Sequence, residues 1–316
     1  MSVLTPSLIP VFKRFTGFAK ESSYGTDPLT GYRWTPAHNA KPEEVIEYQA
    51  DVGLRGIGAQ TFGEYQGVKR SQFSYDLDFY PIDTPGLIPL ILGPDTVTGT
   101  TSPYTHTFKL ASGEPASATF RDYNGIDVWA MSGARLSQMQ FKLDAQKNLS
   151  ASIQGQGFSP SNITLPTASF DTNPYFLGWE ASVVFAGGTA SNHMSMMTLT
   201  LARKLTARYG AVNSQNPTVI FVGPLQMSGS MTFEVEDDTE YDYFPNNTQP
   251  SVVITLTQPT TNFEIVFQMS KCAFTKATFS DSKDYLDLSA DFTAVYNTTD
   301  SGPGLIQVLN SQSQAY

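Results

Sequence analysis

Hydrophobic and polar residues alternate along much of the chain, and this alternation predicts a mainly β fold. In the stretch Ser71–Phe79 every second residue is apolar, so one face of the predicted strand would be buried and the other exposed. Similar runs occur at Leu136–Leu143, Leu149–Ile153, Met194–Leu205, Met227–Glu236, Ser251–Thr257, Phe263–Met269 and Leu286–Val295. Glycine, proline, asparagine and aspartate separate these runs at intervals typical of sandwiches and barrels.

Helical signals are confined to two short segments. Asp83–Leu92 starts with a capping residue and a proline suited to a first helical turn, and Pro89 keeps the element short. Asp237–Phe244 also begins with acidic residues, whose charge favours a helix N-terminus. Each predicted helix follows a predicted strand.

The chain contains an internal similarity. Phe73–Asp78 matches Met231–Glu236, apolar over apolar and acid over acid, at an offset of 158. Farther along, Leu149–Ala151 matches Leu288–Ala290 at an offset of 139, and we expect a longer loop around Thr96–Pro103 in the first half to explain the change. The same order of elements in both halves predicts a duplicated unit.

We therefore predict two tandem β-sandwich domains, each with a short flanking helix. The predicted boundaries are an N-terminal arm at 1–30, a first domain at 31–160, a linker at 161–172 and a second domain at 173–316. In the arm, the spaced aromatic residues Phe12, Phe15 and Phe18 are candidates for packing on something outside the chain's own core; an ordinary first strand with a frayed start remains the alternative.

Charge narrows the range of partners. The net charge is −10, from 19 basic and 29 acidic residues. Residues 161–316 hold 6 basic and 14 acidic residues and so carry −8 of it. Binding of nucleic acid by phosphate neutralisation needs clustered Lys and Arg, so it is not expected, whereas an acidic surface past which nucleic acid slides is compatible with this charge. Solubility is the plainer explanation of the same charge.

No pattern for catalysis, a metal or a cofactor emerges. His38, His106 and His193 lie far apart without partners at metal-ligand spacing, and we expect them to be solvated. Cys272, the only cysteine, lies in a predicted strand and is expected to be buried and inert. The acidic run Glu234–Asp242 lacks the spacing and glycine of a calcium loop. No apolar stretch approaches the length of a membrane helix, so no membrane partner is expected.

The order of these features resembles the tail tube (major tail) proteins of long-tailed bacteriophages. The resemblance begins at Glu21–Thr26, a Glu-x-x-Tyr-Gly-Thr stretch, and continues through the Phe73 strand, Gly86–Gly93 and Tyr104–Phe108. In the second half it includes Met227–Phe233 and the strand Ala290–Ala294. The motifs are short, and the resemblance depends on their order over most of the chain.

The resemblance implies a structural virion protein of the tail, assembled in the host cytoplasm and without enzymatic activity. Its β-sandwich domains would associate with copies of themselves in a ring whose inner strands form a barrel, and rings would stack with help from N-terminal arms. Family members mostly place six domains in a ring, so a duplicated chain would form a trimer with pseudo-sixfold symmetry, with a hexamer as the alternative. The lumen would hold the tape-measure protein and DNA without specific binding.

Asp76, Asp78, Glu234 and Glu236 occupy polar positions of matching strands and are the candidate lumen-facing acids, although a face toward solvent or an interface fits them equally well. Two other functions stay open: another virion β protein, such as a distal tail or capsid decoration component, and a carbohydrate-binding β-sandwich. Aromatic clusters such as Tyr241 and Tyr243 keep the last alternative in view.

Overall fold

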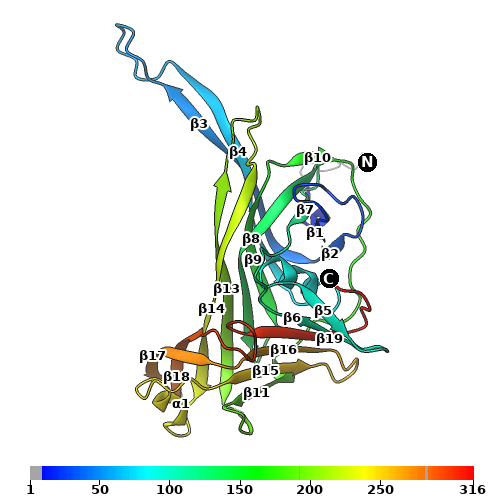
Figure 1. The fold of residues 1–316 in the computed structure, drawn as a ribbon, viewed down its shortest axis with the longest axis vertical. Coiled ribbons are helices and arrows are strands. Elements are labelled where there is room, and N and C mark those ends of the chain that lie inside the picture. Colours follow the sequence, from blue (N-terminus) through cyan, green and yellow to red (C-terminus); the bar gives the residue numbers. More distant parts are fainter. Residues whose placement is uncertain (1–8, 192, 282–283) are drawn as a thin grey trace, which may run out of the picture.

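The computed structural model describes residues 9–191, 193–281 and 284–316, so the first eight residues of the predicted arm lie outside the described part. The fold is mainly β and built from sheets that pack face to face, which confirms the predicted sandwich-type class. An antiparallel long sheet runs along the molecule in the order β3-β4-β9-β8-β13-β14-β18-β17 (Figure 1). Its strands are β3 (Ala37–Asp51), β4 (Gly63–Asp78), β9 (Ser150–Gly157), β8 (Val128–Asp144), β13 (Met194–Arg208), β14 (Val219–Glu234), β18 (Leu286–Ala294) and β17 (Cys272–Asp281).

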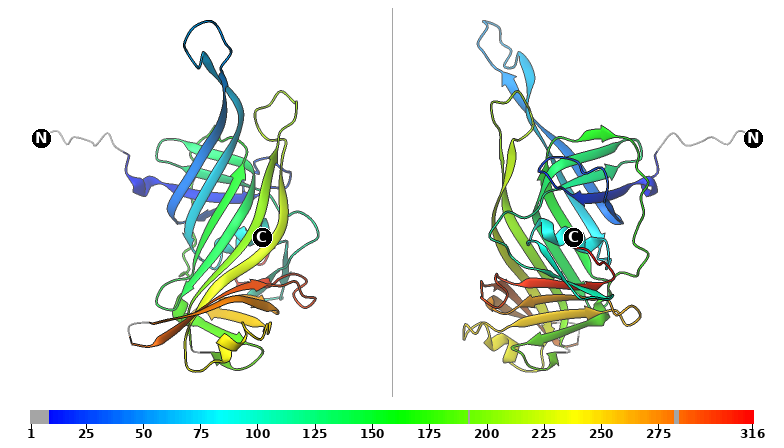
Figure 2. Two further views of the ribbon diagram at one scale, coloured as in Figure 1. Left: turned by 90° about the vertical axis from the view of Figure 1, so that its left-hand side faces the viewer. Right: turned by 45° about the vertical axis from the view of Figure 1, so that its right-hand side comes forward.

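Two side sheets cover one face of the long sheet (Figure 2). The first has the order β2-β1-β7-β8-β10, and β8 belongs to both sheets because it bends at Gly133, a positive-φ residue. Its other strands are β1 (Phe15–Lys20), β2 (Arg33–Thr35), β7 (Ala118–Tyr123) and β10 (Ser161–Ile163). The second has the order β12-β11-β15-β16-β19-β6-β5. Its strands are β12 (Ala190–Ser191), β11 (Ala181–Phe185), β15 (Val252–Thr257), β16 (Glu264–Met269), β19 (Leu305–Asn310), β6 (Tyr104–Phe108) and β5 (Asp95–Thr98).

The same order of strands occurs in both halves of the chain. In the long sheet, β3-β4-β9-β8 is followed by β13-β14-β18-β17, and in the side sheets β2-β1-β7-β8-β10 corresponds to β12-β11-β15-β16-β19. The predicted helices lie at corresponding places after β4 and β14: the 3₁₀ helix η2 (Thr84–Leu90) and the single-turn helix α1 (Thr239–Asp242). Two further short 3₁₀ segments are η1 (Val11–Lys13) and η3 (Gly178–Glu180).

Irregularities in the ladders define the correspondence position by position. The β3·β4 ladder shifts register after Ala37 and again after Ile46. The β13·β14 ladder shifts after Met194 and again after Arg203, with the same spacing between its two shifts. Ala37 thus corresponds to Met194, and every position of β3 has its counterpart in β13 at this one displacement.

The ladder partners extend the correspondence to β4 and β14. Leu77, which pairs with Ala37, corresponds to Phe233, which pairs with Met194. At this displacement Phe73 corresponds to Gly229. The sequence match of Phe73 with Met231 was therefore two positions out of register.

A second set of irregularities relates the remaining strands. The β8·β9 ladder shifts after Leu136, and the β17·β18 ladder shifts after Phe274, so these two residues correspond. Their ladder partners, Gly155 in β9 and Phe292 in β18, correspond in turn. All four strands of each half of the long sheet are thereby matched.

The loop expected at Thr96–Pro103 belongs to an inserted hairpin, β5–β6, rather than to an irregular segment. This hairpin joins the side sheet of the other half, where β6 pairs with β19. One hydrophobic core runs through both halves and includes the fully buried side chains Phe79, Phe141, Phe176, Phe267 and Phe292. The domain boundaries at 31–160 and 173–316 stay predictions; β1, expected within the arm, lies in a side sheet.

Candidate assembly surfaces

The face of the long sheet opposite the side sheets is polar. Along β4, for example, Phe73, Tyr75 and Leu77 are buried against the side sheets, whereas Ser74 and Asp76 point away from the core. Ladder partners carry this polar surface across all eight strands. Its small polar residues include Ser152, Gln154, Gln138, Gln140, Thr198, Thr200, Ser228, Ser230, Thr232, Ser289 and Thr278.

Acids exceed lysines on this polar face. The acids are Glu43, Asp76, Asp78, Asp144, Glu234, Asp287 and Asp291, and the lysines are Lys41, Lys142 and Lys276, which leaves a formal charge of −4 from seven acids and three lysines. Glu234 and Asp287 are direct ladder partners, an arrangement of like charges that destabilises a sheet. Folding alone therefore does not favour this pair.

Three of the four predicted lumen acids lie on the polar face. Asp76 accepts a hydrogen bond from Asn39 at 3.1 Å, and Asp78 lies 2.6 Å from Nε2 of His38. Glu234 closes the ladder at the end of β14, whereas Glu236 follows the strand and lies 3.3 Å from Nε2 of His193. Which acids face a lumen stays a prediction.

Each outer strand of the long sheet has one free edge. β3 pairs only with β4, and β17 pairs only with β18, among the described residues. Eight strands alternate in direction, so β3 and β17 run antiparallel to each other at opposite edges. A free edge offers unpaired N–H and C=O groups to another chain.

The predicted aromatic arm is divided between the core and the surface. Phe18 is buried and packs against Phe120, and Phe15 packs edge-on against Trp34, so both belong to the chain's own side sheet. β1 pairs with β2 on one edge and β7 on the other, so it lies inside its own sheet. Phe15 and Phe18 are three residues apart and point to opposite faces of that sheet. Phe12 is 85% exposed and is the one member of the three that is available to a partner.

The Glu21–Thr26 stretch connects the two halves. Glu21 accepts four hydrogen bonds, from the backbone N–H groups of Gly25 and Gly133 and from the hydroxyls of Ser117 and Thr119. This fixes the loop after β1, in which the hydroxyl of Tyr24 accepts a hydrogen bond of 2.9 Å from the backbone N–H of Ile220 in β14. Burial raises the pKa of Tyr24.

The loop β13–β14 makes a second connection between the halves. Lys69 of β4 donates its backbone N–H to the carbonyl of Gln215 at 2.8 Å, and the Gln215 amide donates to the carbonyl of Gly67 at 2.7 Å. The backbone N–H of Ser159 donates to Asn216 Oδ1 at 2.9 Å. The loop thereby covers the part of β4 that lies beyond the end of β9.

The side chains that could in principle be reactive, the thiol of Cys272 and the imidazole of His106, are buried in the fold. Cys272 is buried, as expected, and burial raises the pKa of its thiol to about 12, which disfavours the reactive thiolate. His106 is fully buried rather than solvated as expected, because β6 is covered in the second side sheet; its ring nitrogens lie 2.6 Å from Asp95 Oδ2 and 2.8 Å from the Gln312 carbonyl. Within residues 9–191, 193–281 and 284–316, no group of three metal-ligating side chains occurs, and no helix there is long and apolar enough to cross a membrane.

Comparison with known families decides the identity. The family model described as "Phage tail tube protein" matches residues 12–294, which spans both halves of the long sheet and most of the chain. The chain belongs to the phage tail tube protein family. This tail tube protein is accordingly a structural component of a bacteriophage tail and part of the virion.

A search of curated proteins returned no match to the tail tube protein. The matched span begins at the exposed Phe12, passes through the Glu21–Thr26 stretch and ends at the last residue of β18. It therefore includes both free edges and the whole polar face of the long sheet.

Proposed function

We propose that this tail tube protein closes head to tail into rings, with β17 of one copy pairing with β3 of the next, and that stacked rings form the tail tube. The observation that carries the proposal is the β8·β13 ladder inside the chain. β17 corresponds to β8, and β3 corresponds to β13. The chain thus contains one example of the junction that its two free edges would form between copies.

The internal ladder also gives the expected register. Lys142 pairs with Thr198 across β8·β13. The correspondence of β8 with β17 and of β13 with β3 converts this pair into Ser280 on one copy and Lys41 on the next. One residue pair farther along the same face, Thr278 would lie opposite Glu43, with Lys276 diagonally adjacent to Glu43 and of opposite charge.

The stagger of the long sheet supports a closed ring. Direct partners across the first half are, in order, Lys41, Ser74, Gln154, Gln138 and Ala202. The residue that corresponds to Lys41 is Thr198, four positions from Ala202 on β13, so each of the four strands contributes about one residue of stagger. A rise of about 3.3 Å per residue against a strand spacing of about 4.8 Å gives a tilt of about 35°, in the range of closed barrels.

Three copies would place 24 strands in the ring, from eight in each long sheet. At this tilt and spacing the backbone cylinder would be roughly 45 Å across. We favour three copies because the tail tube family mostly has six domains in a ring, and each chain has two sets of corresponding strands. A hexamer remains the alternative.

The polar face of the long sheet would line the lumen. Its small hydroxyl and amide side chains and its excess of acids would let DNA and the tape-measure protein pass without specific binding, because like charges repel phosphates. This role gives a reason for keeping the Glu234–Asp287 pair, which the sheet itself disfavours. We propose assembly in the host cytoplasm, ring stacking aided by the exposed Phe12, no cofactor and no catalytic role.

Cysteine cross-linking combined with electron microscopy tests the proposal. A chain carrying Lys41→Cys and Ser280→Cys should form rings at high concentration. Oxidation should then give disulfide-linked species of two and three chains. Native Cys272 is buried and should not compete. The matched control, Lys41→Cys with Thr278→Cys, is out of register by two residues and should link much less. A chain that stays monomeric in the micrographs and does not link through 41 and 280 would contradict the proposal.

A further inference from the structure

The β3–β4 hairpin ends in a loop, residues 52–62, that has no partner outside its own hairpin in the described structure. Its hydrogen bonds go to Asp51: the backbone N–H of Gly53 donates to the side chain and that of Phe62 to the carbonyl. Leu54 and Ile57 are 103% and 71% exposed. The hairpin projects past the rest of the molecule (Figure 1).

The β13–β14 hairpin ends in the corresponding loop, residues 209–218, and this loop is docked. Asp51 and Gly63 pair at the base of the first loop, and Arg208 and Val219 pair at the base of the second, at the displacements already established for these strands. Gly56 and its counterpart Asn213 both have positive φ angles, 69° and 53°. The loops thus share a base and a turn, although the first is one residue longer, and positions up to Ala59 are matched here from the β3 side. Only the second loop contacts β4.

The site on β4 that receives the second loop has a counterpart on β14. Lys69, Gly67 and Ser159, which contact the docked loop, correspond to Leu225, Gly223 and Tyr296. All three counterparts line one groove of about 630 Å³. β14 lies open there, because its ladder with β18 starts only at Ser228.

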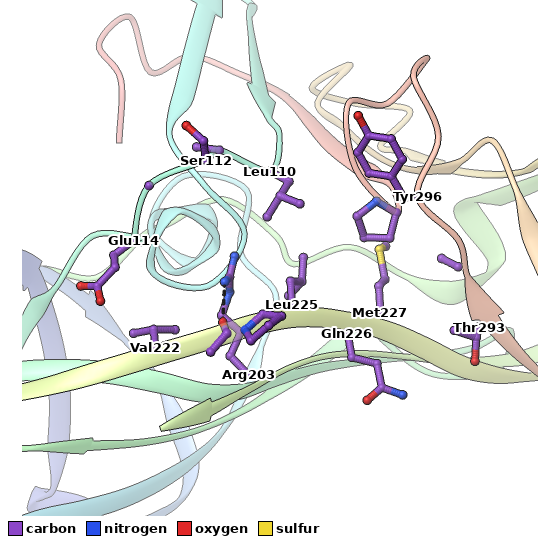
Figure 3. A pocket seen from close by; sticks show the side chains of 16 residues that line it. Leu110, Ser112, Glu114, Arg203, Val222, Leu225, Gln226, Met227, Thr293 and Tyr296 are labelled. Atoms are coloured by element: carbon purple, nitrogen blue, oxygen red, sulfur yellow. Dashed lines mark hydrogen bonds between the residues drawn. The ribbon is translucent and has the colours of Figure 1, made fainter. Parts of the chain in front are cut away.

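The groove is apolar where the site on β4 is polar. Figure 3 shows Leu225 and Met227 pointing from β14 into the space between Leu110 and Tyr296. Two positions of the loops differ in the same sense, since Ile57 stands where the docked loop has Ser214 and Leu54 where it has Ala211, whereas Arg55 stands where it has Val212. Within the chain, loop 209–218 contacts the polar site on β4. Loop 52–62 and the apolar groove beside β14 have no such contact among the described residues.

One hydrogen bond of the docked site is also replaced at the groove. In the docked site the Gly67 carbonyl accepts from the side chain of Gln215. The corresponding residues are Gly223 and Gly58, and Gly58 has no side chain to donate. The Gly223 carbonyl instead accepts from Arg203 of its own chain at 2.9 Å, so it does not need the donor that the loop lacks.

We infer that the groove beside β14 receives loop 52–62 of a second copy of this chain, with Ile57 and Leu54 packed on Leu225. The backbone N–H of Leu225 would donate to the carbonyl of Gly58, as Lys69 donates to Gln215. The inference rests on the head-to-tail ring proposed above, because that ring places β3 of the next copy beside β17. It identifies a contact within a ring, separate from the β17·β3 ladder.

A cysteine pair tests the docking directly. Ala59 and Tyr296 correspond to Asn216 and Ser159, which are in contact, and both are exposed in the single chain. Ala59→Cys with Tyr296→Cys should give disulfide-linked species that stop at the size of one ring. The matched control, Val212→Cys with Tyr296→Cys, should not link, because Val212 lies on the loop that is already docked within its own chain.

An assembly measurement gives an independent readout. Ile57→Asp should raise the concentration needed for ring formation at least tenfold and leave the melting temperature of the monomer unchanged. Val212→Asp, at a similarly exposed position of the docked loop, should leave ring formation unchanged.

Two results would overturn the inference while the ring proposal stands. The first is rings that link through residues 41 and 280 but not through 59 and 296. The second is 59–296 cross-linked species larger than one ring, which would place the loop in the neighbouring ring. Absence of rings together with absence of the 41–280 link would remove the ring proposal and the inference with it.

Discussion

The ring of Phe73 in β4 lies across Gly155 in β9, and a β-carbon on Gly155 would lie 2.5 Å from Phe73 Cζ. At the corresponding place in the second half the partners are exchanged, since Phe292 of β18 lies across Gly229 of β14. An aromatic ring that covers a cross-strand glycine restores packing that the glycine cannot supply. Both halves therefore use one device, with the two residues on opposite strands.

We expect Gly155→Ala and Gly229→Ala each to lower the free energy of unfolding by about 1–3 kcal/mol. The added methyl group would meet backbone as well as the ring, the Arg135 carbonyl in the first case and the Thr198 carbonyl in the second, so repacking the ring alone would not make room. Chemical denaturation of the monomer measures the effect. Gly113→Ala, whose β-carbon meets nothing within 4 Å, is the control, and equal stability of all three variants would contradict the expectation.

The sequence predicted the strands that have one buried face and missed the features that depend on the ladders. The runs at Leu136–Leu143 and Ser251–Thr257 alternate because one side packs on the core, and the structure has strands there. β3 exposes much of both faces, so its 15 residues carry little alternation and its length was not foreseen. The insertion β5–β6 was missed because its partner β19 lies near the opposite end of the sequence.

The two-residue error in matching the halves has a simple physical origin. Side chains alternate between faces with a period of two, so a slip of two residues keeps every apolar residue on the core face. Only the register shifts, such as those at Ile46/Tyr48 and Arg203/Leu205, remove the ambiguity, and they are properties of paired backbones. The free edges and the groove beside β14 depend on the same strand pairing, so they could not be predicted from the sequence either.

Replacing Glu21 even with glutamine, the amide of the same shape, should destabilise the fold. One backbone N–H donates to each carboxylate oxygen, that of Gly133 to Oε1 and that of Gly25 to Oε2. In Glu21→Gln one of these positions would hold an NH₂ group that faces an N–H, whichever way the amide turns. We expect a loss of about 1–3 kcal/mol in the free energy of unfolding.

The control for Glu21→Gln is Glu114→Gln, at an exposed carboxylate paired with Arg135. It should change stability by less than about 0.5 kcal/mol. Denaturant titration of both variants distinguishes the two. A Glu21→Gln chain as stable as the Glu114→Gln chain would mean that the four hydrogen bonds contribute little.

Asp83 should make stability depend on pH. Burial raises the pKa of Asp83 to about 6, against the opposing effect of the nearby Arg33 guanidinium. The Asp83 carboxyl thus keeps its proton to higher pH in the folded state than in the unfolded state. The contribution of Asp83 to stability therefore falls as the pH rises from about 4 to about 6. Asp83→Asn removes that dependence.

We therefore expect Asp83→Asn to be more stable relative to the natural chain at pH 8 than at pH 4. Melting temperatures at the two values measure the difference. Asp127→Asn, at an exposed position, should show no such change. An Asp83→Asn effect of the same size and sign at both pH values would show that the carboxyl titrates normally.

The buried pair of His106 and Asp95 holds the C-terminal segment against the inserted hairpin. Both side chains are fully buried, and Asp95 Oδ2 also accepts a hydrogen bond of 3.0 Å from the backbone N–H of Tyr316. Removing one member would leave the other buried without its partner, so we expect His106→Val and Asp95→Val each to cost about 3–5 kcal/mol. Replacing both with apolar side chains strands neither side chain, although the Tyr316 N–H and the Gln312 carbonyl lose their partners, so the double variant should cost less than the sum of the single variants. A double-mutant cycle by chemical denaturation measures this coupling, and additive losses would show that the two residues act independently.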